Sequence, residues 1–325
     1  MNNAIRVTNL RKKFYVAKNP AGFFGKVRQY LRPRYETLNA VNNISFEVKR
    51  GEKVAFIGPN GAGKSTTIKL LTGIFQPCSG TIEIFDRDPF VDRKKVAYMI
   101  GTVFGQRSQL WYHLPAYDSF RLLATIYNIE YKKFKERLDR LIDIFQLSHF
   151  ISRPVKELSL GERMRCELVA SLLHNPEILF LDEPTIGLDI ISKDAIRRLI
   201  QQRVELESTT IFLTSHDIAD IEKVCDRIIL INHGRIVVDN TVDLIKKSYL
   251  KHKIVKIKTA EEIFWKKHPA IQLAETSAGF YKFEVDLNLM DLQEAVQYFA
   301  QNYQFTDIII EDPSLEEVIK EIYRS

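Results

Sequence analysis

Short apolar runs alternate with longer amphipathic stretches over the first 240 residues of this chain. The runs predict strands near residues 5–8, 44–48, 53–57, 96–103, 178–182, 210–214 and 228–231. Helical spacing of apolar positions between several of these runs makes β and α elements follow one another along the chain. We therefore expect a doubly wound α/β core, with a mainly parallel sheet and an antiparallel edge.

Two further regions differ from this core. Residues 107 to about 175 contain an amphipathic helix, marked by Phe134, Leu138, Leu141, Ile142 and Phe145. From residue 241 a β-α-β-β-α-β-α rhythm follows, with strands expected at Ile254–Ile257, Phe280–Val285 and Phe305–Ile310. Its helices are marked by an apolar stripe from Leu292 to Phe299 and by a cap made of Ser314 and Glu317. Residues 241–325 are thus compatible with a small ferredoxin-like α+β domain, which follows a domain of residues 1–240.

A glycine-rich segment directly follows the apolar run 53–57 and precedes a helix expected from Ser65 to Leu71. Its residues are Gly58, Pro59, Asn60, Gly61, Ala62, Gly63, Lys64, Ser65 and Thr66. Glycines let the backbone turn its N–H groups around phosphate oxygens, and the helix adds its positive end. Lys64 would then neutralise the β- and γ-phosphates of a nucleotide, and the Ser65 hydroxyl would hold Mg²⁺. A glycine-rich turn without a ligand is disfavoured by the strand and helix on either side.

Two adjacent carboxylates end the apolar run 178–181. Successive residues at a strand end point in different directions, so Asp182 can face Mg²⁺ while Glu183 faces the water that attacks the γ-phosphate. We expect Glu183 to be the catalytic base. His216 follows the apolar run 210–213 and leaves the sheet at the same carboxyl edge. Alone, the acid pair would be read as a solvated turn and His216 as a loop residue; the phosphate loop upstream favours the catalytic interpretation.

The segment Leu158-Ser159-Leu160-Gly161-Glu162 resembles the signature segment of ATP-binding cassette (ABC) ATPases. The other segments follow in that family's order, and the resemblance covers residues 1 to about 240. It implies a P-loop ATPase domain whose helical subdomain spans about 107–175. It also implies a head-to-tail dimer, in which Ser159 and Gly161 of one copy contact the γ-phosphate held by the other. Leu160 and Glu162 depart from the family's usual Gly and Gln. The same letters also predict a helix start, with Ser159 as N-cap and Glu162 closing a capping box, and both interpretations can hold together.

The resemblance assigns further roles. His216 would be the switch histidine that contacts the γ-phosphate, and Gln106 would touch Mg²⁺ and the attacking water. Asp189 lies in a segment resembling the D-loop, which crosses the dimer interface. Tyr35 sits where the family places the aromatic residue that stacks on adenine, with Phe14 and Tyr15 as competitors.

Two stretches narrow the resemblance to exporters of the ABC-2 type. They are Val103–Trp111 and Ile310–Val318. The implied function is that of an ATP-hydrolysing subunit with ATP and Mg²⁺ at its site, paired as a homodimer. It would drive a separately encoded transmembrane permease from the cytoplasmic face of the cell membrane. The exposed aromatics expected at Trp111 and Tyr112 are candidates for the permease contact, although burial inside the subdomain is an equal alternative. A soluble ABC ATPase acting on ribosomes or DNA is disfavoured, because this chain has one cassette and no sustained heptads.

The net charge of +6 is unevenly distributed. Residues 1–35 hold nine Lys or Arg and no acid, so the remainder has 38 basic against 41 acidic residues. A basic insertion is expected at about 17–34, and apolar residues recur at helical spacing within 21–34. That segment could contact the anionic inner leaflet or a membrane partner, or pack on its own domain. Nucleic acid is disfavoured, because most of the chain is not basic.

Hydropathy, the start of the chain and the cysteines narrow the expected class of protein further. No apolar stretch approaches the length of a membrane span. The polar, basic start of the chain predicts no signal peptide. Three scattered cysteines, Cys78, Cys166 and Cys225, show no metal spacing and fit a reducing cytosol.

Overall fold

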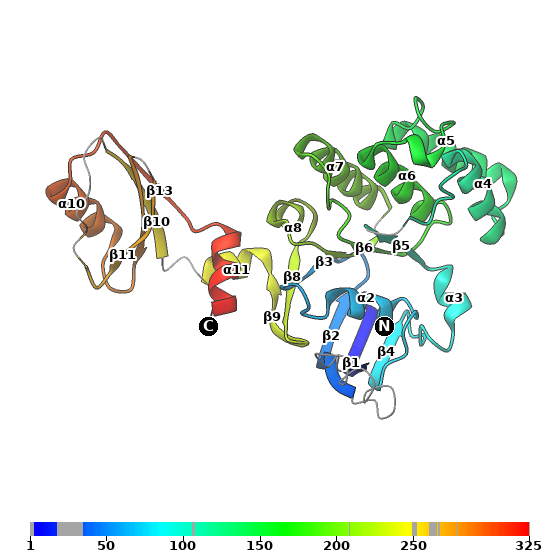
Figure 1. The fold of residues 1–325 in the computed structure, drawn as a ribbon, viewed down its shortest axis with the longest axis horizontal. Helices are drawn as coiled ribbons and strands as arrows, with labels where there is room; N and C mark the ends of the chain where they lie inside the picture. The colour runs from blue at the N-terminus through cyan, green and yellow to red at the C-terminus, as the bar shows by residue number, and fades with distance from the viewer. Residues whose placement is uncertain are drawn as a thin grey trace, which may run out of the picture. The chain divides into compact units, whose positions relative to one another are not determined.

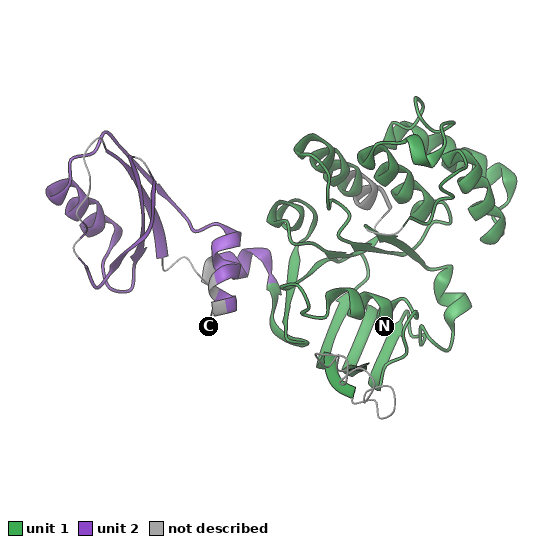
Figure 2. Ribbon diagram, in the orientation of Figure 1, with its two compact units in different colours: residues 1–240 green, residues 241–325 purple. Residues whose placement is uncertain are grey.

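The computed structural model describes residues 3–17, 35–105, 108–207, 209–248, 252–259, 265, 267–277 and 279–324. Gln106 and nearly all of the expected basic insertion, including residues 21–34, lie outside these ranges. The chain divides into two compact units, residues 1–240 and 241–325, shown in Figure 2. Within the described parts of the chain, no helix has both the length and the apolar character that crossing a bilayer requires.

A six-stranded sheet forms the centre of unit 1 (Figure 1). Its order is β5 (Ile100–Phe104), β6 (Ile178–Asp182), β7 (Thr210–Thr214), β3 (Lys53–Ile57), β8 (Arg227–Asn232) and β9 (Arg235–Thr241). The first five strands are parallel. β6 and β7 are buried almost throughout, as expected for strands covered on both faces. His233 and Gly234 join β8 to β9 with positive φ at both positions, which makes a tight hairpin and the expected antiparallel edge.

Two of the predicted strands belong to a second sheet and not to the mainly parallel one. β1 (Asn3–Ala17) pairs antiparallel with both β2 (Tyr35–Lys49) and β4 (Ser79–Ile84). The strands expected at 5–8 and 44–48 are the buried parts of β1 and β2. Each strand continues for 15 residues, through polar positions that an apolar pattern does not reveal.

The strand expected at 96–103 was placed too early along the chain. α3 (Arg93–Ala97) occupies its beginning, and β5 starts only at Ile100. Val96, which suggested the start of a strand, is the buried residue of the short helix α3 and has charged neighbours.

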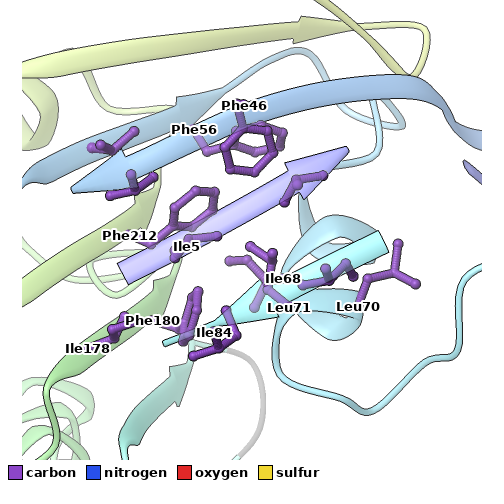
Figure 3. Close-up of a cluster of buried hydrophobic side chains, with 14 of the residues drawn as sticks. Ile5, Phe46, Phe56, Ile68, Leu70, Leu71, Ile84, Ile178, Phe180 and Phe212 are labelled. Atoms are coloured by element: carbon purple, nitrogen blue, oxygen red, sulfur yellow. The ribbon is translucent and has the colours of Figure 1, made fainter. Parts of the chain in front are cut away.

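Four phenylalanines pack the two sheets of unit 1 together (Figure 3). Phe46 comes from β2, whereas Phe56, Phe180 and Phe212 come from β3, β6 and β7. Their ring centroids lie 5.3–6.0 Å apart. Aromatic pairs at this range contribute about 0.5–1.5 kcal/mol each beyond the apolar area they bury. This packing holds the carboxyl ends of β3, β6 and β7 side by side.

Helices flank the central sheet of unit 1. They are α2 (Lys64–Leu71), α3, α4 (Ala116–Ile126), α5 (Tyr131–Phe145), the 3₁₀ turn η1 (Val155–Glu157), α6 (Leu160–Leu172), α7 (Ile190–Glu207) and α8 (Ile218–Val224). α4 and α5 both contact α6. The predicted stripe on α5 is confirmed, since Phe134, Leu138, Leu141 and Phe145 are buried. Trp111 and Tyr112, before α4, are 38% and 54% exposed.

Unit 2 contains one four-stranded antiparallel sheet of order β11-β12-β10-β13. Its elements are α9 (Val242–Ser248), β10 (His252–Lys258), β11 (Ile271–Ser277), β12 (Phe280–Asp286), α10 (Leu292–Asn302), β13 (Asp307–Glu311) and α11 (Leu315–Arg324). Ala295 and Phe299 of α10 pack with Val255 and Phe283 of the sheet to form a separate core. The helix expected between the first two strands falls largely on residues outside the described ranges.

Candidate functional site

The glycine-rich loop joins β3 to α2 and is closely surrounded by backbone. Gly61 and Gly63 have φ of +82° and +109°, a region that favours glycine. A Cβ added at Gly63 would lie 2.3 Å from the carbonyl oxygen of Ala40, and one at Gly58 would lie 2.2 Å from that of Ile231. Nothing lies within 4 Å of the equivalent position at Gly61. Glycines 58 and 63 therefore let the loop lie against its neighbours, while the loop around Gly61 stays open.

The β8–β9 turn holds this loop through main-chain hydrogen bonds. The N–H of Gly234 donates to the carbonyl oxygen of Ala62 at 3.0 Å, and the N–H of Asn42 donates to that of Gly234 at 2.8 Å. The antiparallel edge, the loop and β2 are thus connected through one residue.

Lys64 lies beneath the loop and is only 8% exposed. Its Nζ donates to the carbonyl oxygens of Gly58 at 2.6 Å and Pro59 at 3.3 Å. Burial lowers the pKa of Lys64, while the charges of Glu183 and Asp182 act in the opposite direction. A partly desolvated ammonium at a helix N-terminus is well suited to an anionic ligand.

Asp182 ends β6 and accepts hydrogen bonds from hydroxyl groups on two other elements. Thr214 Oγ1 donates to its Oδ1 at 2.6 Å, and Ser65 Oγ donates to the same atom at 3.3 Å. Asp182 and Thr214 are register partners in the parallel pair β6–β7, which explains their contact. In the described ranges no three His, Cys, Asp or Glu side chains are grouped to hold a metal. Mg²⁺ needs only one or two protein oxygens when phosphates and water supply the rest, so Ser65 and Asp182 fit it together with a nucleotide.

Glu183 and His216 meet at the carboxyl edge of the sheet. His216 Nδ1 lies 2.6 Å from Glu183 Oε2. The backbone of Glu183 adopts a φ of +55°, and its N–H donates to the carbonyl oxygen of Thr214 at 3.0 Å. The turn at Glu183 directs its side chain toward His216, while Asp182 faces Ser65. The side chains of Glu183 and His216 are 18% and 59% exposed.

One pocket of about 640 Å³ collects most of the predicted nucleotide-site residues. It is lined by Pro59 to Thr66, Glu183, Ile186, His216, Phe14, Leu38 and Ala40. Tyr35 is not in its lining. Tyr35 begins β2, pairs with Ala17 and is 60% exposed. Among the described residues, the aromatic side chain in the pocket wall is that of Phe14, whose ring packs edge-on against Phe75 at 5.5 Å.

The signature segment forms the start of α6 and lines a second pocket. Ser159 Oγ accepts from the N–H of Glu162 at 3.2 Å, and Glu162 Oε2 accepts from the N–H of Ser159 at 2.8 Å. The predicted capping box is therefore confirmed. This second pocket, of about 470 Å³, is lined by Gln146, His149, Phe150, Ser159, Gly161, Glu162, Arg165 and Ser192.

Asp189 caps α7 beside this second pocket. Its carboxylate accepts from the N–H of Ser192 at 3.0 Å and from Ser192 Oγ at 2.6 Å, and these hydrogen bonds lower the pKa of Asp189. Ile190 and Ile191 follow and are 84% and 83% exposed. Two apolar side chains thus face solvent next to the signature segment.

Comparison with known proteins identifies the family of this chain. The sequence model of the ABC transporter family matches residues 41–186. The bacitracin transport ATP-binding protein of Bacillus licheniformis is 35% identical over 222 residues, which make up 68% of this chain and 71% of that protein. The chain belongs to the ABC transporter family. It is an ATP-binding subunit of this family.

Further ABC relatives agree in sequence and fold. The lantibiotic transport ATP-binding protein of Streptococcus pyogenes is 33% identical over 217 residues, or 66% of this chain and 90% of that protein. Among solved structures, the cbiO1 subunit of the ABC transporter complex cbiONQ from Clostridium perfringens has a TM-score of 0.62 and 26% identity. The alignment covers 77% of this chain and 96% of the cbiO1 chain. The expected fold class is thereby confirmed.

Sequence reasoning missed several residues of this ABC ATPase site. Thr214 contacts Asp182, and Leu38 and Ala40 line the pocket. Thr214 could have been found from its place at the end of an apolar run parallel to 178–182. Leu38 and Ala40 gave no local signal, because they enter the site through the pairing of β1 with β2.

Proposed function

We propose that this chain hydrolyses ATP as a homodimer and drives a separately encoded ABC-2-type permease, in the export direction, from the cytoplasmic face of the cell membrane. The observation that carries the proposal is the Glu183–His216 pair, with Nδ1 and Oε2 2.6 Å apart, in the pocket of the phosphate loop. Binding alone would need the loop and Lys64 but no such pair.

Nucleotide binding would use the loop and the helix behind it. The backbone N–H groups of residues 60–63 and the N-terminus of α2 favour negative charge, and Lys64 adds its ammonium. Phe14 is the described aromatic side chain placed to stack on adenine. Bound Mg²⁺, held by Ser65 and Asp182 with Gln106 as a further expected ligand, would neutralise charge on the β- and γ-phosphates.

Hydrolysis would use Glu183 to position and deprotonate water. The water oxygen forms a bond to the γ-phosphorus, the bond from that phosphorus to the β–γ bridging oxygen breaks, and the proton of the water goes to the Glu183 carboxylate. Because a carboxylate only accepts hydrogen bonds, Nδ1 of His216 carries the proton in their contact. His216 thus holds Oε2 in place, which leaves Oε1 for the water.

The homodimer is supported by the two pockets of one chain. Ser159 and Gly161 line a pocket that shares no residue with the phosphate pocket, so in this proposal each binds nucleotide together with the other pocket of a second copy. The exposed Ile190 and Ile191 lie beside Asp189, where the partner copy would cover them. Helix N-termini bind anions, so the Ser159 cap is suited to the partner's γ-phosphate.

The remaining assignments rest on the sequence and on its resemblance to the family. Residues 1–240 would be the nucleotide-binding domain, with its helical subdomain at about 107–175, and residues 241–325 an accessory domain. Trp111 and Tyr112 are exposed and would contact the permease. Residues 21–34 would meet the inner leaflet or the permease. Export is supported by the resemblance of Ile310–Val318 to ABC-2-type exporters.

A Glu183→Gln substitution tests this function. It should lower ATP turnover by at least about 100-fold, because the amide cannot accept the proton of water. The variant should still bind MgATP and should become dimeric, as measured by light scattering after size exclusion. Glu177→Gln is the matched control at the opposite end of β6, where Glu177 pairs with Arg50 on the surface. Wild-type turnover in Glu183→Gln, or monomers alone at saturating MgATP, would contradict the proposal.

A further inference from the structure

Asp220 is a buried carboxylate at the centre of a polar cluster behind the pocket. It lies on α8 and is 1% exposed. Its Oδ2 accepts from Thr185 Oγ1 at 2.5 Å and from Ser215 Oγ at 2.6 Å. Its Oδ1 accepts from Arg197 Nε at 2.5 Å. Each oxygen of the carboxylate therefore has its own partners, and the negative charge is balanced by the guanidinium.

The two hydroxyls come from the segments that carry the reacting side chains. Thr185 is two residues after Glu183, and Ser215 immediately precedes His216. Both are buried, at 3% and 1% exposure. One oxygen atom of Asp220 thus joins the turn after β6, which carries Glu183, to the turn after β7, which carries His216.

Arg197 extends the cluster to α7. Besides Asp220, its guanidinium binds Asp217 Oδ2 at 3.0 Å, and Lys193 Nζ binds the same oxygen at 2.7 Å. Asp217 immediately follows His216, so the turn that carries the histidine is held from both sides. α7 begins directly after Asp189, in the segment where the second copy is expected.

We propose that Asp220 is a positioning residue for ATP hydrolysis, which fixes the separation of Glu183 and His216 and connects it to α7 through Arg197. This inference rests on the proposed function. A buried ion pair by itself contributes little net stability, because its desolvation offsets the attraction. Here the carboxylate instead gathers both catalytic turns on one atom. Rearrangement at the start of α7 would therefore be transmitted to the catalytic pair.

Three substitutions remove the contacts separately. Thr185→Val and Ser215→Ala each delete one hydroxyl and leave the pair of Asp220 with Arg197. Asp220→Asn keeps the shape but removes the charge. Each should lower kcat by about tenfold to 100-fold, the range expected when a reacting group is displaced by up to about 1 Å. Binding of the non-hydrolysable analogue AMP-PNP with Mg²⁺, measured by calorimetry, should stay within about twofold, because the phosphate loop and Lys64 are untouched.

The second readout is coupling to His216. If Asp220 acts through the catalytic pair, Asp220→Asn should slow the His216→Ala variant far less than it slows wild type. Asp239→Asn is the matched control, because Asp239 accepts from Arg227 at 2.6 and 2.8 Å in a carboxylate–guanidinium pair. Arg227 is the first residue of β8, at the opposite end of that strand from the turn that holds the phosphate loop. Asp239→Asn should leave kcat unchanged.

The outcomes separate this inference from the proposed function. If folded Thr185→Val and Ser215→Ala turn over at the wild-type rate, or if Asp220→Asn and His216→Ala lower kcat by independent factors, the inference is wrong. Thr185→Val keeps the test decisive should Asp220→Asn fail to fold. A wild-type protein without ATPase activity would refute the proposed function itself.

Discussion

Gly61 and Gly63 both have a positive φ, but only Gly63 is closely surrounded. Substituting alanine at each position therefore separates the cost of backbone strain from the cost of a steric clash. Gly61→Ala meets no neighbour within 4 Å, so it should lose only about 1–2 kcal/mol from left-handed strain. Gly63→Ala adds a clash with the Ala40 carbonyl oxygen, 2.3 Å from the new Cβ, and should lose about 1–3 kcal/mol more. Urea unfolding of both variants measures the difference. Equal losses would mean that the loop can move away from β2.

His174 makes the stability of unit 1 depend on pH. Its Nε2 lies 2.9 Å from the carbonyl oxygen of Ile100, which only accepts, so Nε2 carries the proton. Nδ1 is buried without a partner among the described residues, and the ring stacks on Tyr127 at 4.0 Å. Burial lowers the pKa of His174 to about 4, and the charge of Arg137 acts in the same direction.

The sign of the resulting pH dependence follows from these two states. Between pH 6.5 and about 4 the unfolded chain binds a proton at His174 that the folded chain does not, so stability falls as the pH falls. This group should remove about 2 kcal/mol between pH 8 and pH 5. Urea unfolding of wild type and His174→Gln at both pH values isolates it from other titrating groups. Parallel pH profiles for the two proteins would rule out His174 as the cause.

At the scale of elements, α6 and α10 begin with the same capping box. Ser159 and Glu162 form it on α6, and Asp291 and Glu294 form it on α10. Removing either N-cap with Ser159→Ala or Asp291→Ala should cost about 1 kcal/mol of unfolding free energy. Only Ser159→Ala should also lower ATP turnover, because only that cap is proposed to meet the partner's phosphate. Equal turnover in both variants would reduce the signature serine to a structural cap.

Some elements of this fold could be predicted from sequence because their signals are local. The stripe of α5, the apolar runs of β6 and β7 and the caps at Ser159 and Ser314 are each contained in a few consecutive residues. β1 and β2 were only partly anticipated, since residues 35–39 are exposed although they pair with β1.

The candidate site divides in the same way. Loop residues 59–66, Glu183 and His216 do meet in one pocket, and each was visible as a motif or a strand end. The contact of Thr214 with Asp182 could be inferred from the ends of two apolar runs. The place of Phe14 in the pocket wall and the hydroxyls on Asp220 depend on pairing between distant segments, which no local pattern encodes.

At the scale of the whole molecule, the two units have separate cores. One cluster of buried side chains in unit 1 lies between Ala4 and Ile231, and one in unit 2 lies between Val255 and Phe299. A chain ending at residue 240 should therefore fold and bind MgATP with unchanged affinity, as measured by thermal unfolding and calorimetry. Insoluble protein, or a loss of binding, would show that unit 2 completes the first core.

The backbone of Glu183 carries a consequence for engineering. A side chain held at a φ of +55° costs about 1–2 kcal/mol that glycine would not. Selection for heat-resistant variants without an activity screen would therefore favour glycine at position 183. That change would remove the side chain proposed to act as the catalytic base. Thermal stability and ATP turnover thus make opposite demands on residue 183. A consensus or thermostabilised version of this cassette should therefore keep glutamate at this position.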